Sequence, residues 1–378
     1  MRILHVVGAM NRAGTETMLM NIYRNIDRKK VQFDFISYSD QDAHYDDEIK
    51  DRGGRVIKLS KTNSIKEIYR AIKKYGPYDA VHAHTLFHCG IAVIAAYLAG
   101  VEIRISHAHT TMDSSSRFTR KAYIKLTRFI INHLSTNLLA CSRGAGKYLF
   151  GDKGLAKPKY SYFPNAIEYL TFLINPQKKV TELKVKEGLG KSIVIGHIGR
   201  FIEAKNHTFI LEIMKHLINR DPAIKLLLVG DGDLKQQIEG KAKQEGILEN
   251  IRFTGIRHDI STMLHSMDVF IFPSHYEGLG LVLLEAQACG LPAVVSEAIQ
   301  PEADLGIGLL SKLSLADGPD IWADRIVELA GQKEKNTYTI INGFEKSGYS
   351  LKRAISTLMT IYQSSSGGQY ERDINRQF

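Results

Sequence analysis

Short apolar runs rich in Val, Ile, Leu and Phe alternate with helix-like segments along most of the chain. This alternation predicts strand–helix–strand units, which build parallel sheets. The expected strands are 2–7, 33–37, 55–59, 79–83, 103–107 and 137–141 in the first half, and 192–198, 224–229, 251–254, 269–273 and 292–296 in the second. The pattern therefore predicts an α/β protein with two doubly wound domains in series. Such sheets bind ligands at the carboxyl ends of their strands, so we expect a shared ligand in a cleft between the domains.

One segment breaks the alternation and divides the chain. Residues 173–191 contain an Asn-Pro pair, many Lys and Glu side chains and a Gly-Leu-Gly sequence, which are typical of a linker. Residues 351–362 are patterned as a final helix. We expect a first domain at 1–172, the linker at 173–191 and a second domain at 192–350. A helix at 351–365 would return to the first domain, and a loosely ordered polar tail would follow at 366–378.

Composition narrows the class of protein. The 378 residues are 44% hydrophobic and 24% charged, which is typical of a globular protein without disorder. Cys89, Cys141 and Cys289 are far apart and odd in number, which argues against a disulfide framework and a zinc cluster. The apolar run at the N-terminus is short, and no stretch of about 18 apolar residues follows. We therefore expect a cytoplasmic protein that does not span a membrane.

The net charge of +10 is unevenly placed. Between 117 and 159, ten basic residues accompany a single acid, Asp152. Such a field attracts nucleic acid or an anionic membrane, although a solvated face is an open alternative. Within 117–134 the pattern is amphipathic, with Arg117, Lys121, Lys125 and Arg128 on one helical face. The chain has no nucleic-acid-binding motif, so we expect contact with an anionic membrane surface and no binding of nucleic acid.

The most informative segment runs from Asp268 to Ala286, where a buried strand leads through a glycine-containing turn into an apolar helix near Gly280. A helix start of this kind suits a phosphate group. Glu277 and Glu285 are eight residues apart, so both could face one ligand, with a carboxylate on the vicinal hydroxyls of a ribose. Glu285 lies among apolar residues, where an unpaired charge is costly. This favours a ligand over a surface position.

Two cations occupy a comparable position earlier in the second half. Arg200 and Lys205 follow directly after the expected strand 192–198, and therefore emerge at the carboxyl end of a strand. There they could neutralise a diphosphate, with Arg as a fork and Lys as a point charge.

Taken in order, these segments resemble the donor-binding domain of glycosyltransferase family 4. The resemblance rests on Gly199-Arg200 with Lys205, Leu228 to Gly232, Phe253-Thr254-Gly255, Pro273-Ser274, and Glu277 and Glu285 followed by Ala286 to Pro292. It extends over roughly residues 1–365 and implies the GT-B fold of two Rossmann-like domains, with retention at the anomeric carbon. It implies that Arg200 and Lys205 hold the donor diphosphate and Glu285 the ribose. Glu277 and the backbone of Gly278, Leu279, Gly280 and Leu281 would contact the donor sugar and phosphate, and Ile256 and Arg257 would lie near the base.

In the first half the resemblance is carried by two short segments. The glycine-rich loop after the first strand retains Gly14, which implies close approach to phosphate or acceptor. The sequence Ser106 to Thr111 resembles the family's His-Thr stretch, which places His109 beside the reacting sugar, with His107 as the second choice. His82, His84 and His88 could also suggest zinc, but no cysteine or acid lies at ligand spacing. We therefore predict no metal and no cofactor, and favour a UDP-sugar over a GDP-sugar as donor.

The resulting prediction is a retaining glycosyltransferase with His109 and Glu277 as catalytic residues. It would move a sugar from a nucleotide-sugar to a lipid-linked oligosaccharide in bacterial surface polysaccharide synthesis. Its place would be the inner face of the plasma membrane. Two alternatives use the same scaffold, a non-catalytic protein that binds nucleotide-sugars or polyanions and a sugar-nucleotide epimerase.

Overall fold

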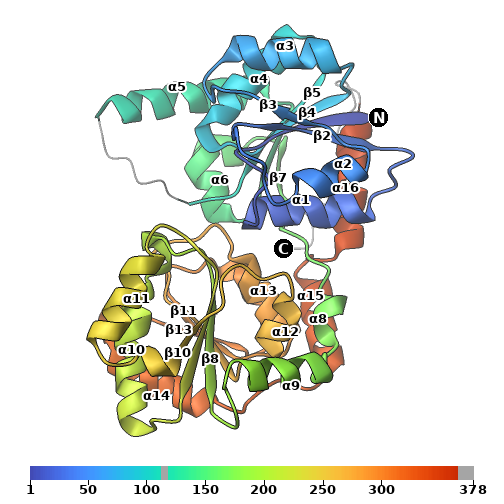
Figure 1. Cartoon of the computed structure of the whole chain (residues 1–378). Coiled ribbons are helices and arrows are strands. Elements are labelled where there is room, and N and C mark those ends of the chain that lie inside the picture. The colour runs from blue at the N-terminus through green and yellow to red at the C-terminus, as the bar shows by residue number, and fades with distance from the viewer. Residues whose placement is uncertain (112–117, 365–378) are drawn as a thin grey trace. The chain divides into compact units, whose positions relative to one another are not determined.

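Two parallel sheets with helices packed on their faces make up the computed structural model, which describes residues 1–111 and 118–364 (Figure 1). Each sheet belongs to its own unit, one formed by Met1–Ala166 with the segment from Leu351, and one formed by Ile167–Ser350. The prediction of two doubly wound domains is therefore confirmed. The linker expected at 173–191 lies inside the second unit, where the helix Gln177–Lys186 forms its middle part. The polar tail expected at 366–378 is outside the described residues.

The first sheet has seven strands in the order β3-β2-β1-β4-β5-β6-β7. Its strands are β1 (Arg2–Val6), β2 (Gln32–Ser37), β3 (Val56–Lys58), β4 (Ala80–Ala83), β5 (Ile103–Ala108), β6 (Asn137–Ala140) and β7 (Tyr160–Tyr162). The central strands are buried on both faces, which explains their almost unbroken apolar runs. The strand order reverses between β1 and β4, so the loops that follow these two strands diverge.

Helices cover both faces of this sheet. They are α1 (Gly14–Asn25), α2 (Asp46–Asp51), α3 (Ile65–Tyr75), η1 (Leu86–His88), α4 (Cys89–Leu98), α5 (Phe118–Leu134), α6 (Arg143–Phe150), α7 (Asp152–Leu155) and α16 (Leu351–Gln363). The last of these, drawn in red, packs beside α1 in Figure 1, so the C-terminal helix returns to the first unit as predicted. Among the described helices none is long and apolar enough to cross a membrane.

The second sheet has six strands in the order β10-β9-β8-β11-β12-β13. Its strands are β8 (Val194–Ile198), β9 (Lys225–Val229), β10 (Ile251–Phe253), β11 (Val269–Phe272), β12 (Ala293–Ser296) and β13 (Leu310–Leu313). Its helices are α8 (Leu170–Leu173), α9 (Gln177–Lys186), η2 (Glu203–Lys205), α10 (His207–Arg220), α11 (Lys235–Gln244), η3 (Leu248–Asn250), α12 (Ile260–His265), α13 (Leu281–Ala288), η4 (Pro301–Ala303), η5 (Leu315–Asp317), α14 (Pro319–Leu329) and α15 (Thr337–Lys346).

The core of the second unit is centred on Trp322, whose fully buried ring packs against Phe209 with ring centroids 5.4 Å apart. Around it lie apolar side chains of the central strands and of α10 and α14. All the predicted strands exist, with ends that differ by one or two residues. Among the described strands, only β7 and β13 were not predicted, because these short edge strands are half-buried and give no apolar run.

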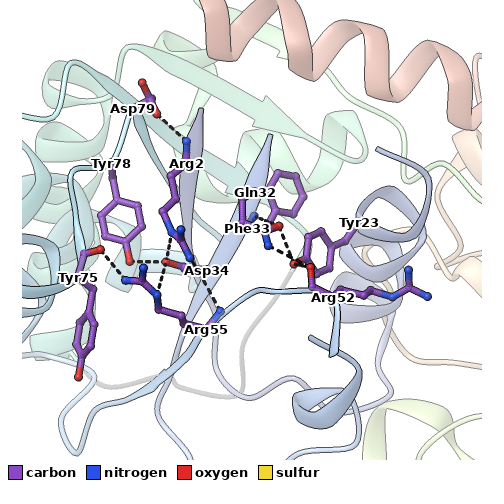
Figure 2. A network of polar contacts seen from close by, with 10 residues as sticks. All are labelled: Arg2, Tyr23, Gln32, Phe33, Asp34, Arg52, Arg55, Tyr75, Tyr78 and Asp79. Atoms are coloured by element: carbon purple, nitrogen blue, oxygen red, sulfur yellow. Dashed lines mark hydrogen bonds and ion pairs between the residues drawn. The ribbon is translucent and has the colours of Figure 1, made fainter. Parts of the chain in front are cut away.

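A buried carboxylate joins the amino ends of several strands in the first unit. Asp34 is fully buried and accepts hydrogen bonds from the Arg2 guanidinium at 2.7 and 2.9 Å, the Tyr78 hydroxyl at 2.8 Å and the Arg55 backbone N–H at 3.0 Å (Figure 2). Its charge is thereby compensated by an arginine and satisfied by four donors. Because these donors come from β1 and from the segments before β3 and β4, Asp34 fixes how three parts of the chain meet.

We predict that Asp34→Asn destabilises the first unit by about 3 kcal/mol, because it leaves the guanidinium of Arg2 without its charge partner and places an amide N–H₂ among donors. Urea unfolding followed by far-UV circular dichroism measures the change. Asp47→Asn is the matched control, since the Asp47 side chain is 91% exposed and forms a surface ion pair with Lys50 on α2. Equal stability of the two variants would contradict this role.

Candidate functional site

The reversal of strand order in the second sheet brings two loops to one place. β8 lies next to β11, and the loops that follow these strands lead to η2 and to α13. In doubly wound sheets the carboxyl ends of the two strands at such a reversal form the ligand site. The residues singled out in the sequence at 199–207 and 273–285 belong to these two loops and to the helices that follow them.

An ion pair between Lys205 and Glu277 connects the two loops. The Lys205 ammonium donates to the Glu277 carboxylate across 72 residues of sequence, and both side chains are largely buried, at 16% and 13% exposure. The ammonium also lies over the Phe272 ring, 4.4 Å from its centroid. The backbone N–H of His275 donates to the carbonyl of Ala204 at 2.8 Å and holds the loops together. The structure thus brings together two residues that the sequence analysis assigned to one donor site.

The start of α13 offers backbone N–H groups beside this pair. Gly280 caps the helix with φ +80°, a left-handed conformation that favours glycine, and a Cβ there would approach Leu283 and Phe272 at 3.3 Å. Leu279 and Leu281 are only 2% and 8% exposed. Their side chains therefore belong to the core, and only their backbone could contact a ligand. The first N–H groups and the positive end of the helix dipole suit an anion.

Glu285 is the fifth residue of α13 and is half-buried. Within the described part of the chain it has no hydrogen bond and no ion pair to another residue. Burial raises the pKa of this carboxyl from 4.5 to about 7. The described residues supply no hydrogen-bond donor to this buried carboxylate. A ligand with hydroxyl groups would provide such donors.

Glycines bring the loops after β8, β9 and β10 into close contact. Gly199 N–H donates to the Val229 carbonyl at 3.0 Å, and Gly230 N–H donates to the Gly255 carbonyl at 2.8 Å. Gly230 has φ +137°, and a Cβ there would lie 2.0 Å from the Gly199 carbonyl oxygen. Only glycine allows this approach, so the sequence at these positions sets the spacing of the loops.

The side chains at this edge differ in how firmly they are held. Arg200 is exposed, and the Ile256 side chain is 45% exposed. Arg257 forms a bidentate pair with Asp259 at 2.8 and 2.9 Å, which raises the pKa of the guanidinium. The contacts of these residues with a diphosphate and a base stay predictions.

In the first unit the candidates Gly14 and His109 lie at carboxyl ends of strands. Gly14 is exposed and is the first residue of α1. His109 follows β5 and is half-buried, and its Nε2 lies 2.9 Å from Nδ1 of His84. His107, the second choice for the catalytic residue, lies one pleat earlier on β5 and is buried.

The sequence alone did not predict that His109 belongs to a cluster. The rings of His84 and His107 lie against it, with centroids 5.1 and 4.0 Å away, and His5 and His82 join the cluster through His84. The sequence did contain a signal for this cluster, because histidines two residues apart on a strand lie on the same face of the sheet. Which strands are neighbours was also needed to place the histidines of one strand beside those of the next. In two triads that share His84, one nitrogen of each ring lies within 4.8 Å of the others. The prediction of no metal relied on spacing along the chain, which does not reflect this arrangement.

Comparison with known proteins identifies the family. Residues 12–169 match the family described as Glycosyltransferase Family 4, and residues 179–345 match the family described as Glycosyl transferases group 1. The chain is 37% identical to the glycosyltransferase-family protein EpsF of Bacillus subtilis (strain 168), with coverage of 99% of this chain and 98% of EpsF. The chain belongs to glycosyltransferase family 4. It is therefore a glycosyltransferase, as the resemblance in the sequence implied.

Other relatives of this glycosyltransferase agree in length and fold. It is 28% identical to the capsular polysaccharide biosynthesis glycosyltransferase CapH of Staphylococcus aureus, over 96% of this chain and 99% of CapH. Among solved structures, Anabaena HepE in complex with UDP and glucose superimposes with a TM-score of 0.76 at 17% identity, over 95% of this chain and 98% of HepE. This likeness confirms the GT-B fold.

We predict that Glu285→Gln stabilises the second unit at pH 8 by about 2 kcal/mol and leaves its stability at pH 5 almost unchanged. The folded-state pKa of Glu285 is raised to about 7. Its contribution to stability is therefore complete below the ordinary pKa near 4.5 and is lost as the pH rises through 7. Urea unfolding at several pH values measures the difference between the variant and the unmodified enzyme.

The exposed Glu297 provides the matched control, and Glu297→Gln should show no such dependence on pH. A stability difference for Glu285→Gln that stays constant from pH 5 to pH 8 would contradict the raised pKa. If Glu285 is retained because it binds the nucleotide, the Glu285→Gln variant should be more stable than the unmodified enzyme and should bind the nucleotide more weakly.

Proposed function

We propose that this glycosyltransferase transfers a sugar from a UDP-sugar to a lipid-linked oligosaccharide in bacterial surface polysaccharide synthesis, with retention at the anomeric carbon. The observation that carries the proposal is the buried Lys205–Glu277 pair beside the start of α13, at the reversal of the second sheet. This arrangement presents a cation, a carboxylate and free backbone donors to one ligand.

The groups at this site match the parts of a nucleoside diphosphate sugar. Lys205 and Arg200 are the cations for the diphosphate, together with the N–H groups at the start of α13. Glu285 accepts hydrogen bonds from ribose hydroxyls, which would supply the donors that its carboxylate lacks. The uridine nucleotide is supported by relatives, since HepE was solved with UDP-glucose and a relative in Escherichia coli is named a UDP-Gal-dependent galactosyltransferase.

In the proposed reaction the bond between the anomeric carbon and the donor phosphate oxygen breaks. A bond to the acceptor oxygen forms on the same face of the sugar. Lys205 and the helix start stabilise the negative charge that develops on the departing diphosphate, which in turn takes the proton of the acceptor hydroxyl. Glu277 holds hydroxyls of the donor sugar, and His109 is the catalytic candidate in the first unit. Gly14 at the start of α1 approaches the acceptor or the phosphate.

The acceptor class is supported by the relatives. The Escherichia coli relative, 27% identical over 74% of this chain and 75% of its own length, is named for transfer onto GlcNAc-diphosphoundecaprenol, a lipid-linked sugar. CapH is named for capsular polysaccharide biosynthesis. A lipid-linked acceptor also agrees with a protein surface that can bind a membrane.

We predict that UDP-sugars raise the melting temperature of the purified protein more than GDP-, ADP-, CMP- or dTDP-sugars, because a ligand that binds only the folded state stabilises it.

We expect Glu277→Ala to reduce kcat/KM for transfer by about 100- to 1,000-fold, the range for removal of one group that stabilises a transition state. The acceptor in this assay is a short-chain polyprenyl diphosphate sugar.

Lys243→Ala, on an exposed part of α11, is the control for a change of charge alone. Because Glu277→Ala also removes the partner of Lys205, thermal unfolding of each variant separates a folding defect from a loss of transfer. Full transfer by a folded Glu277→Ala variant would disprove the catalytic assignment. If no nucleotide-sugar changed the melting temperature, the donor site itself would be wrong.

Helix α5 is the candidate membrane surface, although the predicted face is only partly correct. Lys121 and Lys125 are exposed, and Leu126 and Phe129 are each 60% exposed beside them. Arg128 instead packs inward, where its guanidinium donates to the Tyr148 carbonyl at 2.6 Å. Arg117 lies outside the described residues. The exposed strip therefore combines basic and apolar side chains, a combination that suits the headgroup region of an anionic bilayer.

We predict that the double variant Leu126→Ser/Phe129→Ser binds vesicles of phosphatidylglycerol and phosphatidylcholine at least tenfold more weakly in a sedimentation assay, because two exposed apolar side chains no longer enter the bilayer. Transfer to a water-soluble acceptor analogue should be unchanged. Ile174→Ser/Val185→Ser is the matched control, since these residues are 72% and 76% exposed in the second unit. Equal binding by both double variants would contradict a membrane role for α5.

A further inference from the structure

Five histidines share one face of the first sheet at the reversal between β1 and β4. His5 on β1 lies level with His82 on β4, and β4 is followed in the sheet by β5, which carries His107. His84 and His109 continue these two strands. The face that carries the rings is the one packed by α16, because the Tyr362 hydroxyl of that helix lies 2.9 Å from Nδ1 of His82.

Hydrogen bonds divide the five rings into two chains. In one chain, Nδ1 of His5 lies 3.1 Å from Nε2 of His84, and Nδ1 of His84 lies 2.9 Å from Nε2 of His109. In the other, His82 connects Tyr362 to Nδ1 of His107 at 3.2 Å. Three buried nitrogens have no hydrogen-bond partner among the described residues, namely Nε2 of His5, Nε2 of His107 and Nδ1 of His109.

The rings of the first chain are neutral. Burial lowers the pKa of His5 and of His109 to about 3 and lowers the pKa of His84 well below 6.5. A neutral imidazole has one N–H donor and one acceptor nitrogen. The three rings therefore have only two consistent arrangements. Either every ring carries its proton on Nδ1, or every ring carries it on Nε2.

The buried end of the chain selects between these arrangements. The ring of His5 packs between Phe33 and Phe35, with centroids 4.3 and 5.3 Å away, and its Nε2 has no acceptor within reach. A proton on this nitrogen would be a buried N–H without a partner, which is the rarer defect in folded proteins. The arrangement with every proton on Nδ1 leaves a bare nitrogen there instead and moves the unpaired N–H to Nδ1 of His109. That nitrogen is covered too, but it belongs to a half-buried residue just after β5, where a substrate can supply an acceptor, whereas the fully buried ring of His5 is enclosed by apolar rings.

We propose that His5 and His84 are positioning residues that hold His109 in its Nδ1–H tautomer, so that His109 donates a hydrogen bond from Nδ1 to an oxygen of the bound sugar substrate. The role in transfer rests on the proposed function, while the tautomer itself does not. Nδ1 of His109 is covered and has no partner within the described chain, while the residue as a whole is half-buried. A substrate oxygen that displaces its cover would therefore satisfy this nitrogen.

A metal ion is the competing occupant of this cluster. The two triads around His84 have nitrogens within 4.8 Å, a spacing that imidazole ligands of zinc or cobalt can adopt. An ion bound by His84 would take a nitrogen that already forms a hydrogen bond to His5 or to His109. Neither triad includes a carboxylate to offset a buried double charge. The hydrogen-bonded arrangement is therefore favoured, and the test includes metal binding.

The proposal is tested with two substitutions at the far end of the chain. His5→Phe removes the donor to His84 and leaves a ring between Phe33 and Phe35, whereas the amide of His5→Asn keeps a donor close to the position of Nδ1. Long-range ¹H–¹⁵N correlation spectra of the full-length protein report the proton position on each ring, with His109 assigned from His109→Asn. We expect Nδ1–H at His109 in the unmodified protein and in His5→Asn, and a mixture of tautomers in His5→Phe.

Kinetics measure the consequence for transfer. His5→Phe should lower kcat about tenfold with KM for the donor changed less than twofold, and His5→Asn should restore most of kcat. A purely structural role would instead lower thermal stability in proportion to activity. His216→Asn, at an exposed position of α10, should change neither the tautomer nor kcat.

Three results would overturn the proposal. The first is an Nε2–H tautomer at His109 in the unmodified protein, or a tautomer that His5→Phe does not change. The second is unchanged kcat in His5→Phe although its tautomer has shifted. The third is saturable binding of Co²⁺, followed by its visible absorption, that His84→Ala abolishes. If no acceptor or donor supports transfer at all, the proposed function fails, and the spectra still decide the tautomer.

Discussion

The reversal of strand order in each parallel sheet is the constraint on which the candidate site depends. Where β1 meets β4 and where β8 meets β11, the following loops diverge, and the carboxyl ends of the strands stay uncovered by their own connections. The Lys205–Glu277 pair lies at one reversal and the histidine cluster at the other. The candidate residues for the chemistry of this glycosyltransferase thus lie where the topology leaves polar groups room to meet a ligand.

Buried polar groups at the two ends of the first sheet differ in how fully they are hydrogen-bonded. At the amino end, Asp34 is satisfied by four donors and fixes the strands. At the carboxyl end, among the residues that the structure describes, Nδ1 of His109 has no hydrogen-bond partner, and in the second unit the Glu285 carboxylate has no donor. Unsatisfied groups of this kind cost stability, and their presence at the ligand-binding end is expected where function sets the residue.

Much of the fold could be predicted from the sequence, and so could the local placement of the candidate donor-site residues. Buried parallel strands are continuous apolar runs, so their positions were predicted to within one or two residues, whereas β7 and β13, half-buried at the edges, were missed. Glu277, Gly280 and Glu285 lie in one segment whose spacing places them on a loop and the helix after it. Arg128 lies on the helix as predicted, but its guanidinium is held by the Tyr148 carbonyl, because helical periodicity gives the angle of a residue and not the neighbour that binds its side chain.

The sequence by itself determined the strand–helix alternation, the glycines at close approaches and the motif of the donor site, because each of these follows from local spacing and backbone geometry. The tertiary structure alone decided the Lys205–Glu277 pair and the chain from His5 through His84 to His109. These contacts join residues 72, 79 and 25 positions apart. Such contacts depend on the order and register of strands, which no local pattern of residues encodes.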